Sequence, residues 1–207
     1  MTTCPKLEKR AHIKGLIIQG TVSALLESGL SAVTMKKIAA KAGVNTATLH
    51  YYFADKNALL TAAVQLIVSQ ISRELSANLG QQPDIRKCIE MVICNSWQVM
   101  ARTRDIQLLQ YELLLYTLRN VETQSIAKFQ YDGYRKLYED LFRHALADIS
   151  PPGAIDLADL ARFVVAGMDG LILQYLVDPD AEKSLRSHRQ LICAAQALLD
   201  VPASQLC

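Results

Sequence analysis

The chain has 207 residues, about half of them hydrophobic, and a formal net charge of only +2. This length allows a sizeable core and fits one small and one larger domain. Sparse aromatic, proline and glycine residues favour an all-α protein, and the near-neutral charge excludes a protein that coats DNA along its whole length.

The charge is unevenly distributed along the chain. Residues 1–60 carry eight Lys/Arg against three Asp/Glu, a net charge of +5, whereas the remainder carries 14 against 17, a net charge of −3. A basic N-terminal part, residues 1–60, on a mildly acidic remainder is typical of a protein that contacts nucleic acid only through its N-terminal part.

No targeting segment, membrane span or metal motif is visible. Cys4, Pro5 and Lys6 interrupt any apolar run at the start, and no run of about 18 apolar residues predicts a span. The five cysteines are scattered and odd in number, and no Cys/His group has the spacing of a zinc site. We expect a cytoplasmic protein with no membrane partner, no disulfide framework, no metal and no cofactor.

In chain order, residues 1–9 are expected to form a loose basic arm. The apolar spacing then predicts a helix over about 7–28, which Gly29 ends. Gly20 lies within this helix, where the missing side chain would let another segment pack closely.

The stretch from Thr34 to Lys56 predicts two short helices joined by a tight turn. Thr34 can cap the first helix, Gly43 can end it with a positive φ, and Asn45 can cap a second helix over 46–52. This is the pattern of a helix-turn-helix, which presents its second helix to the DNA major groove. An ordinary helical hairpin with a solvated basic face is the alternative that spacing alone leaves open.

The outward-facing residues of this stretch suit DNA contact. Lys36, Lys37 and Lys41 are placed near phosphates, and Lys56 at a new helix start is placed beside the DNA backbone. Phosphate contacts position a protein without reading sequence. Small or hydrogen-bonding side chains on the second helix are placed to read base edges. The predicted DNA-binding set is Thr34, Lys36, Lys37, Asn45, Thr46, Ala47, Thr48, His50, Tyr51 and Lys56.

Helical periodicity continues through the rest of the chain. We expect helices over about 56–80, 83–102, 104–119, 122–147, 154–177 and 181–200, with a loop at 150–153 and a break at 178–180. The helix from Lys56 would span roughly 35 Å and could transmit a conformational change from the C-terminal part of the chain to the DNA-reading helices.

The residues TMKKIA at 34–39, AGVNTATLHYYF at 42–53 and KNALL at 56–60 resemble the DNA-binding domain of the TetR/AcrR family of bacterial repressors. The resemblance covers about the first 60 residues. Asn45 replaces the commoner Ser, which keeps the cap. His50 stands where Tyr is usual, which puts the operator sequence in doubt rather than the fold.

The resemblance implies an all-α fold of about nine helices. A helix-turn-helix domain would occupy residues 1–55, and a regulatory and dimerisation bundle would occupy 56–207. It also implies a transcriptional regulator rather than an enzyme: a repressor that binds a palindromic operator as a homodimer and is released by a small, mostly apolar effector. The last two helices would pair with their copies in a second subunit, through Val164, Gly167, Leu171 and Leu191.

The resemblance further implies a ligand cavity in the C-terminal bundle. Large adaptable side chains on helices expected to face inward could line it, with a few polar anchors. The candidates are Met91, Trp97, Met100, Gln110, Tyr111, Phe129, Met168, Asp169 and Tyr175.

Two other readings remain open at this stage. One is a helical enzyme or carrier with an incidental helical hairpin. No motif that pairs a nucleophile with a general base, no phosphate-binding loop and no metal motif supports it. A DNA-binding regulator controlled by a partner protein or by cysteine oxidation, rather than by a small ligand, is the stronger alternative.

Overall fold

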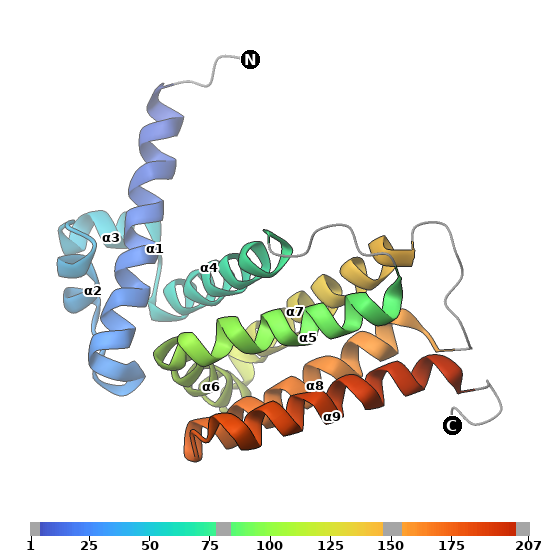
Figure 1. Cartoon of the computed structure of the whole chain (residues 1–207). Coiled ribbons are helices and arrows are strands. Elements are labelled where there is room, and N and C mark those ends of the chain that lie inside the picture. The colour runs from blue at the N-terminus through green and yellow to red at the C-terminus, as the bar shows by residue number, and fades with distance from the viewer. Residues whose placement is uncertain (1–4, 78–83, 147–154, 202–207) are drawn as a thin grey trace. The chain divides into compact units, whose positions relative to one another are not determined.

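The computed structural model describes residues 5–77, 84–146 and 155–201 (Figure 1). Within these ranges the chain forms nine α-helices and two short 3₁₀ helices, and no strand. The prediction of an all-α fold is therefore confirmed. The elements are α1 (Pro5–Ala32), α2 (Met35–Lys41), α3 (Thr46–Tyr52), α4 (Lys56–Ala77), α5 (Ile85–Arg102), α6 (Arg104–Arg119), η1 (Val121–Thr123), α7 (Gln124–Leu146), α8 (Leu157–Val177), α9 (Ala181–Ala197) and η2 (Leu198–Asp200).

Most boundaries agree with the expected ones, and the differences have local causes. Residues 5–9 form the first turns of α1, so the expected loose arm is wrong for this part, while residues 1–4 lie outside the described residues. Gly29 interrupts α1 with a φ of 69°, as expected, but helical turns resume beyond it. Helix α8 begins later than expected, after the Asp156 side chain accepts a hydrogen bond from the Ala158 amide. The loop predicted at 150–153 lies outside the described residues.

The chain divides into two compact units. One comprises the residues up to Ile67 together with Leu108–Gln130, and the other comprises Val68–Gln107 and the residues from Tyr131 onward. Helices α4, α6 and α7 each contribute residues to both units. These units are defined by compactness alone and do not test where the DNA-binding domain ends. The predicted boundary between residues 55 and 56 therefore stays a prediction.

In the first unit, α1 supports the two short helices that follow it (Figure 1). Ile17, Ile38 and Leu49, one from each helix, are completely buried. A Cβ added at Gly20 would lie 2.6 Å from the amide nitrogen of Ala42, at the end of α2. The glycine therefore lets α1 approach the backbone of the helix-turn-helix, which confirms the expected role of Gly20.

In the second unit, α5, α8 and α9 pack against one another (Figure 1). Their shared core contains Ile89, Ile93 and Leu160, all completely buried. The Arg86 guanidinium of α5 donates to the Gln196 carbonyl of α9 and pairs with Asp200, so polar contacts join the ends of these helices.

Helix α8 is long and apolar enough to cross a membrane, judged by length and composition alone. It packs on α5 and α9, however, and buries one face against them. The core helix of a soluble protein passes the same test, so this feature is weak evidence for a membrane span.

Replacing Gly20 with Ala should destabilise the first unit by about 1–3 kcal/mol, because the new methyl group overlaps fixed backbone atoms of Ala42. The free energy of unfolding in urea, followed by circular dichroism, measures this change. Gly15→Ala is the matched control on the same helix. A Cβ at Gly15 meets nothing within 4 Å, so this substitution should be neutral or stabilising by up to ~1 kcal/mol. Equal effects of the two substitutions would contradict the close-approach role of Gly20.

Candidate nucleic-acid interface and effector region

The turn between α2 and α3 is held by the caps that the sequence predicts. The Thr34 hydroxyl accepts a hydrogen bond from the Lys37 amide at 3.3 Å, and the Asn45 side chain accepts one from the Thr48 amide at 2.7 Å. Gly43 lies between the helices with a φ of 66°, in the left-handed region that favours glycine. The cap roles of Thr34 and Asn45 and the turn role of Gly43 are thus confirmed.

Helix α3 has one buried and one exposed face. Leu49 is fully buried and anchors the helix, while Thr48 is half-buried. On the other side, Thr46, Ala47, His50 and Tyr51 are all exposed, with Tyr51 at 69%. This exposed face carries hydroxyl, imidazole and methyl groups, which are groups that can contact base edges in the major groove.

A cation from α1 lies beside this face. The Arg10 guanidinium is 5.7 Å from the centroid of the Tyr51 ring, within the range of a cation–π contact. Sequence reasoning missed Arg10, because no motif spacing links α1 to α3.

The lysines of α2 differ in how they are held. Lys36 is exposed, and its ammonium group has no hydrogen-bond or ion-pair partner among the described residues. The Lys37 ammonium donates to the Ser28 hydroxyl and the Ala32 carbonyl, and the Lys41 ammonium pairs with Glu27 at 2.8 Å. These contacts are exposed and therefore weak, so Lys36 is the most available phosphate ligand of the three.

Lys56 has an internal role that the sequence did not indicate. Its ammonium donates to the Leu30 carbonyl at 3.0 Å and to the Val33 carbonyl at 3.3 Å, and the residue is half-buried. The Leu30 amide in turn donates to the Glu112 carboxylate of α6 at 3.4 Å. Because the break at Gly29 disturbs the helix here, Lys56 supplies a hydrogen-bond donor to the end of α1. The expectation that its ammonium faces the DNA backbone differs from this geometry.

In the second unit, three rings from three helices form a cluster. The Trp97 ring of α5 meets the Tyr175 ring of α8 edge-on, with centroids 5.0 Å apart. The His188 ring of α9 lies 5.5 Å from the Trp97 centroid in a tilted arrangement. Trp97 and Tyr175 were both predicted effector residues, and the structure brings them together. His188 was missed, because a single His on an amphipathic helix carries no distinguishing signal.

Polar groups lie within the same unit. The Ser96 and Tyr138 hydroxyls are 2.7 Å apart in a fully buried pair, and burial raises the pKa of Tyr138 to about 12 despite this bond. Burial also raises the pKa of the Asp169 carboxyl, and a hydrogen bond with Tyr131 opposes that rise. Among the predicted methionines, Met168 is buried, whereas Met91 and Met100 are half-buried.

The other three predicted effector residues belong to the first unit. Gln110 is buried and Tyr111 is half-buried. Phe129 is 45% exposed and lines a hollow of about 480 Å³, together with Asn57 and Thr61 of α4. Phe129 was expected to face inward, and its exposure differs from that expectation because it lies on the outer side of the first turns of α7.

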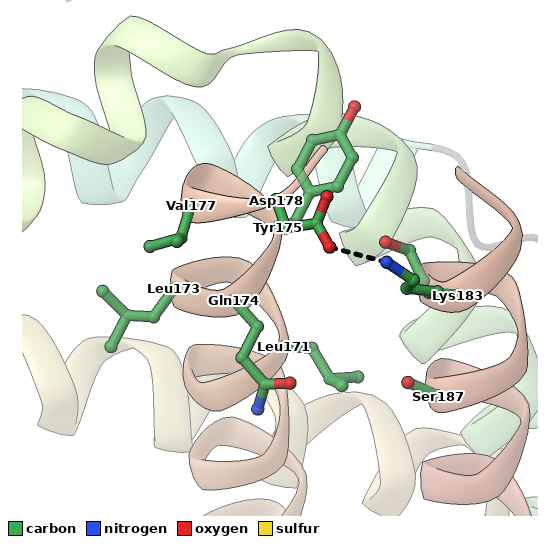
Figure 2. Close-up of a pocket in the computed structure, with 9 residues that line it drawn as sticks. Leu171, Leu173, Gln174, Tyr175, Val177, Asp178, Lys183 and Ser187 are labelled. Atoms are coloured by element: carbon green, nitrogen blue, oxygen red, sulfur yellow. Dashed lines mark hydrogen bonds and ion pairs between the residues drawn. The ribbon is translucent and has the colours of Figure 1, made fainter. Parts of the chain in front are cut away.

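A second hollow, of about 450 Å³, lies where α8 turns into α9 (Figure 2). Figure 2 shows Leu171 and Ser187 extending into the space between the two helices. An ion pair between Asp178 and Lys183, with an oxygen–nitrogen distance of 2.7 Å, bridges the end of this space. Tyr175 of the ring cluster also lines the hollow.

The predicted dimer residues divide into inner and outer positions. Val164 is completely buried and Leu191 is nearly so within the chain itself, so their part in a subunit interface stays a prediction. Gly167 lies against the Leu191 side chain, so its missing Cβ serves the packing of α8 on α9 in one chain. Leu171 is half-buried. The exposed stripe of α8 is instead formed by Phe163, Ala166, Leu173 and Val177.

Two of the three described cysteines, Cys88 and Cys94, argue against the oxidation alternative, whereas Cys193 is exposed. Burial raises the pKa of the Cys88 thiol to about 11, and burial also raises the pKa of Cys94. Both shifts disfavour the reactive thiolate. In the described part of the chain, no group of three or more His, Cys, Asp or Glu residues could hold a metal ion.

Two family models match this chain. Residues 17–63 match the bacterial regulatory proteins of the tetR family, and residues 92–198 match the tetracyclin repressor-like C-terminal domain. The second match alone covers more than half of the chain. The chain belongs to the TetR family of transcriptional regulators. As a TetR-family protein it is a DNA-binding regulator of transcription, and α2–α3 is its helix-turn-helix.

Individual relatives agree with this assignment. The nicotine-responsive transcriptional repressor HdnoR of Paenarthrobacter nicotinovorans is 24% identical over 79% of this chain and 83% of its own length. The transcriptional regulator FadR of Bacillus subtilis, solved with stearoyl-CoA, superposes with a TM-score of 0.70 at 15% identity, over 88% of this chain and 97% of FadR. The multidrug-binding protein EbrR, solved with imidazole, gives a TM-score of 0.63 at 22% identity, over 93% of this chain and 97% of EbrR. The two structural likenesses establish the fold.

Replacing Lys56 with Met should destabilise this TetR-family protein in the absence of DNA by about 1–3 kcal/mol, because the Leu30 and Val33 carbonyls lose a charged donor. The free energy of unfolding and the hydrogen exchange of the α1–α3 amides measure the effect. Lys36→Met is the control, and it should leave both quantities unchanged. If Lys56 only binds phosphate, Lys56→Met should leave stability and hydrogen exchange unchanged, as Lys36→Met does.

Proposed function

We propose that this TetR-family protein is a cytoplasmic repressor that binds a palindromic operator as a homodimer and is released by a small, mostly apolar effector. The observation that carries the proposal is the exposed face of α3, where Thr46, Ala47, His50 and Tyr51 surround a buried Leu49 anchor. The anchor fixes the orientation of the helix, so the four exposed side chains would be presented to the groove in one register.

The proposed DNA contacts divide into two kinds. Thr46 and His50 would read base edges, because each offers a hydrogen-bonding group on the exposed face. Lys36, at the start of α2, would meet a phosphate and add affinity without sequence preference. Thr34 and Asn45 would act indirectly, since their side chains already cap α2 and α3.

A homodimer accounts for the exposed stripe of α8. Phe163, Leu173 and Val177 recur at helical spacing, and a Cβ added at Gly170 on the same side meets nothing within 4 Å. An obligate interface of this kind commonly buries upward of ~2,000 Å² and resembles a core cut in half. The two-fold symmetry of such a dimer would place two α3 helices on half-sites about 34 Å, or a multiple, apart.

Release by a small effector is supported by the ring cluster and by the relatives. Trp97 and Tyr175 provide aromatic surface within the second unit. HdnoR responds to nicotine, and FadR was solved with stearoyl-CoA. An effector acts only through its different affinity for two states, and a shift from 1:99 to 99:1 requires roughly 5.5 kcal/mol of that difference.

His50→Ala and Lys36→Ala should affect operator binding in different ways. His50→Ala should cost ~1–3 kcal/mol on the operator and nothing on random DNA. Lys36→Ala should weaken binding to operator and to random DNA to the same extent. It should also lower the number of counterions released on binding, read from the salt dependence of the binding constant, by about one. Gel shifts with the DNA flanking its own gene, at several salt concentrations and against random competitor, measure these effects.

Lys87→Ala, which changes an exposed lysine of α5, is the control for these gel shifts. It should leave both operator and random binding unchanged. Equal losses on operator and random DNA for His50→Ala would remove the base-reading role of α3.

Leu173→Glu should convert the dimer to a monomer and abolish operator binding, because it places a charge in the proposed interface. Light scattering after size exclusion measures the mass. Leu115→Glu is the control: Leu115 of α6 is 53% exposed and Leu173 is 47% exposed. A Leu173→Glu protein that stays dimeric would rule out the α8 stripe as the interface.

A further inference from the structure

Two cations on one face of α1 lie over aromatic rings at the C-terminal end of α3. The Arg10 guanidinium is 5.7 Å from the centroid of the Tyr51 ring, and the Lys14 ammonium is 5.8 Å from the centroid of the Phe53 ring. Arg10 and Lys14 are one helical turn apart, so they share a side of α1. Both distances are within the range of a cation–π contact. Helix α1 therefore contacts the end of α3 through two rings.

The two rings differ in how firmly the core holds them. Phe53 is only 6% exposed, so packing already fixes its orientation. Tyr51 is 69% exposed and projects from the face of α3 that is proposed to enter the groove. An exposed side chain can exchange among its staggered rotamers. Of the two cations, Arg10 is therefore the one that acts on a ring whose orientation the core does not set.

Tyr51 is also held by its neighbour on α3. The Tyr51 and Tyr52 rings meet edge-on, with centroids 5.2 Å apart and an interplanar angle of 86°. An edge contact from α3 and a cation over the ring from α1 together favour one orientation of the Tyr51 phenol. A side chain that is ordered before binding loses less conformational entropy when the complex forms.

The guanidinium of Arg10 is suited to hold a ring. It is planar and stacks on an aromatic face, which a compact ammonium group does less well. Arg10 is exposed, and no carboxylate in the described part of the chain forms an ion pair with it. No acidic side chain there competes with the Tyr51 ring for this cation.

We propose that Arg10 is a positioning residue for operator recognition, which holds the Tyr51 ring in the orientation that contacts base edges without reading a base itself. The proposal rests on the proposed function, in which the exposed face of α3 enters the major groove. A tyrosine there offers a hydroxyl group to base edges and an apolar ring to a thymine methyl group. Sequence preference then depends on a residue that lies outside the helix-turn-helix.

Selection from a pool of random-sequence duplexes tests this proposal, because it requires no known operator. Full-length wild type, Arg10→Met, Tyr51→Leu and the double variant each enrich duplexes from the same pool, and sequencing gives the base preference at each position. Competition gel shifts then measure discrimination, which is the Kd of a duplex with one base pair changed divided by the Kd of the wild-type consensus duplex. Lys9→Met is the matched control, because Lys9 is the neighbouring exposed cation on α1.

Tyr51→Leu should relax the preference at particular base pairs, and Arg10→Met should relax it at the same base pairs and at no others. Discrimination there should fall roughly 3- to 30-fold in Arg10→Met, the range expected for a cation–π contact from exposed to desolvated. The double variant should be no more relaxed than Tyr51→Leu, because Arg10 acts only through the Tyr51 ring. Lys9→Met should keep the wild-type preference at every position, with at most a uniform loss of affinity.

The other patterns of preference would overturn the proposal. A uniform loss of affinity in Arg10→Met, with the preference unchanged, would make Arg10 a phosphate contact. Relaxation at base pairs that Tyr51→Leu leaves unchanged would make Arg10 a base reader, and relaxation at every position would make its role structural. Additive losses in the double variant would show that the two residues act independently. Wild-type preference in Tyr51→Leu would leave Arg10 no reading residue to position.

The wild-type selection separates this proposal from the proposed function. A wild type that enriches no sequence would contradict base reading by α3, and the role of Arg10 would fall with it. A wild type that enriches a palindromic site, together with an Arg10→Met variant that discriminates equally well at every position of that site, would support the proposed function and contradict the role of Arg10.

Discussion

The close approach of α1 to the turn of the helix-turn-helix is the constraint on which DNA reading depends. Gly20 leaves room for the backbone of Ala42, and no side chain could occupy that position without moving α1 or α2. Thr34, Asn45 and Gly43 then fix the two short helices, and Lys56 secures the end of α1 through two carbonyls. Each helix of seven residues is too short to be stable alone, so the pose of α3 comes from these contacts and from the buried Leu49.

Helix α8 is apolar on two opposite sides, one buried in its own chain and one exposed. One side places Val164, Met168 and Ile172 in the core of the second unit. The opposite side exposes Phe163, Leu173 and Val177. A helix with both faces apolar passes a membrane-span test, yet the same pattern is expected of a helix that packs within its own chain and also against a partner.

The polar groups buried in the second unit fall into satisfied and unsatisfied kinds. Ser96 and Tyr138 bond to each other, so their pair stabilises one arrangement of α5 and α7. Asp169 keeps a hydrogen bond with Tyr131 despite its burial. His188 Nδ1 has no partner in strict hydrogen-bond geometry, although the Ser184 backbone one turn earlier acts on the ring and opposes the lowering of its pKa by burial.

The sequence by itself determined the all-α class, the helix-turn-helix, its caps and the family, because capping and helical periodicity are local properties that neighbouring residues decide. It also paired Trp97 and Tyr175 in one predicted site. Only the tertiary structure decided which side of a long apolar helix is exposed, moving the candidate interface from Val164 and Leu191 to Leu173 and Val177. It likewise turned Lys56 inward and brought His188 to Trp97, since these contacts join residues 26 and 91 positions apart in the chain. Periodicity gives the faces of a helix, but only packing against other helices decides which face meets the core.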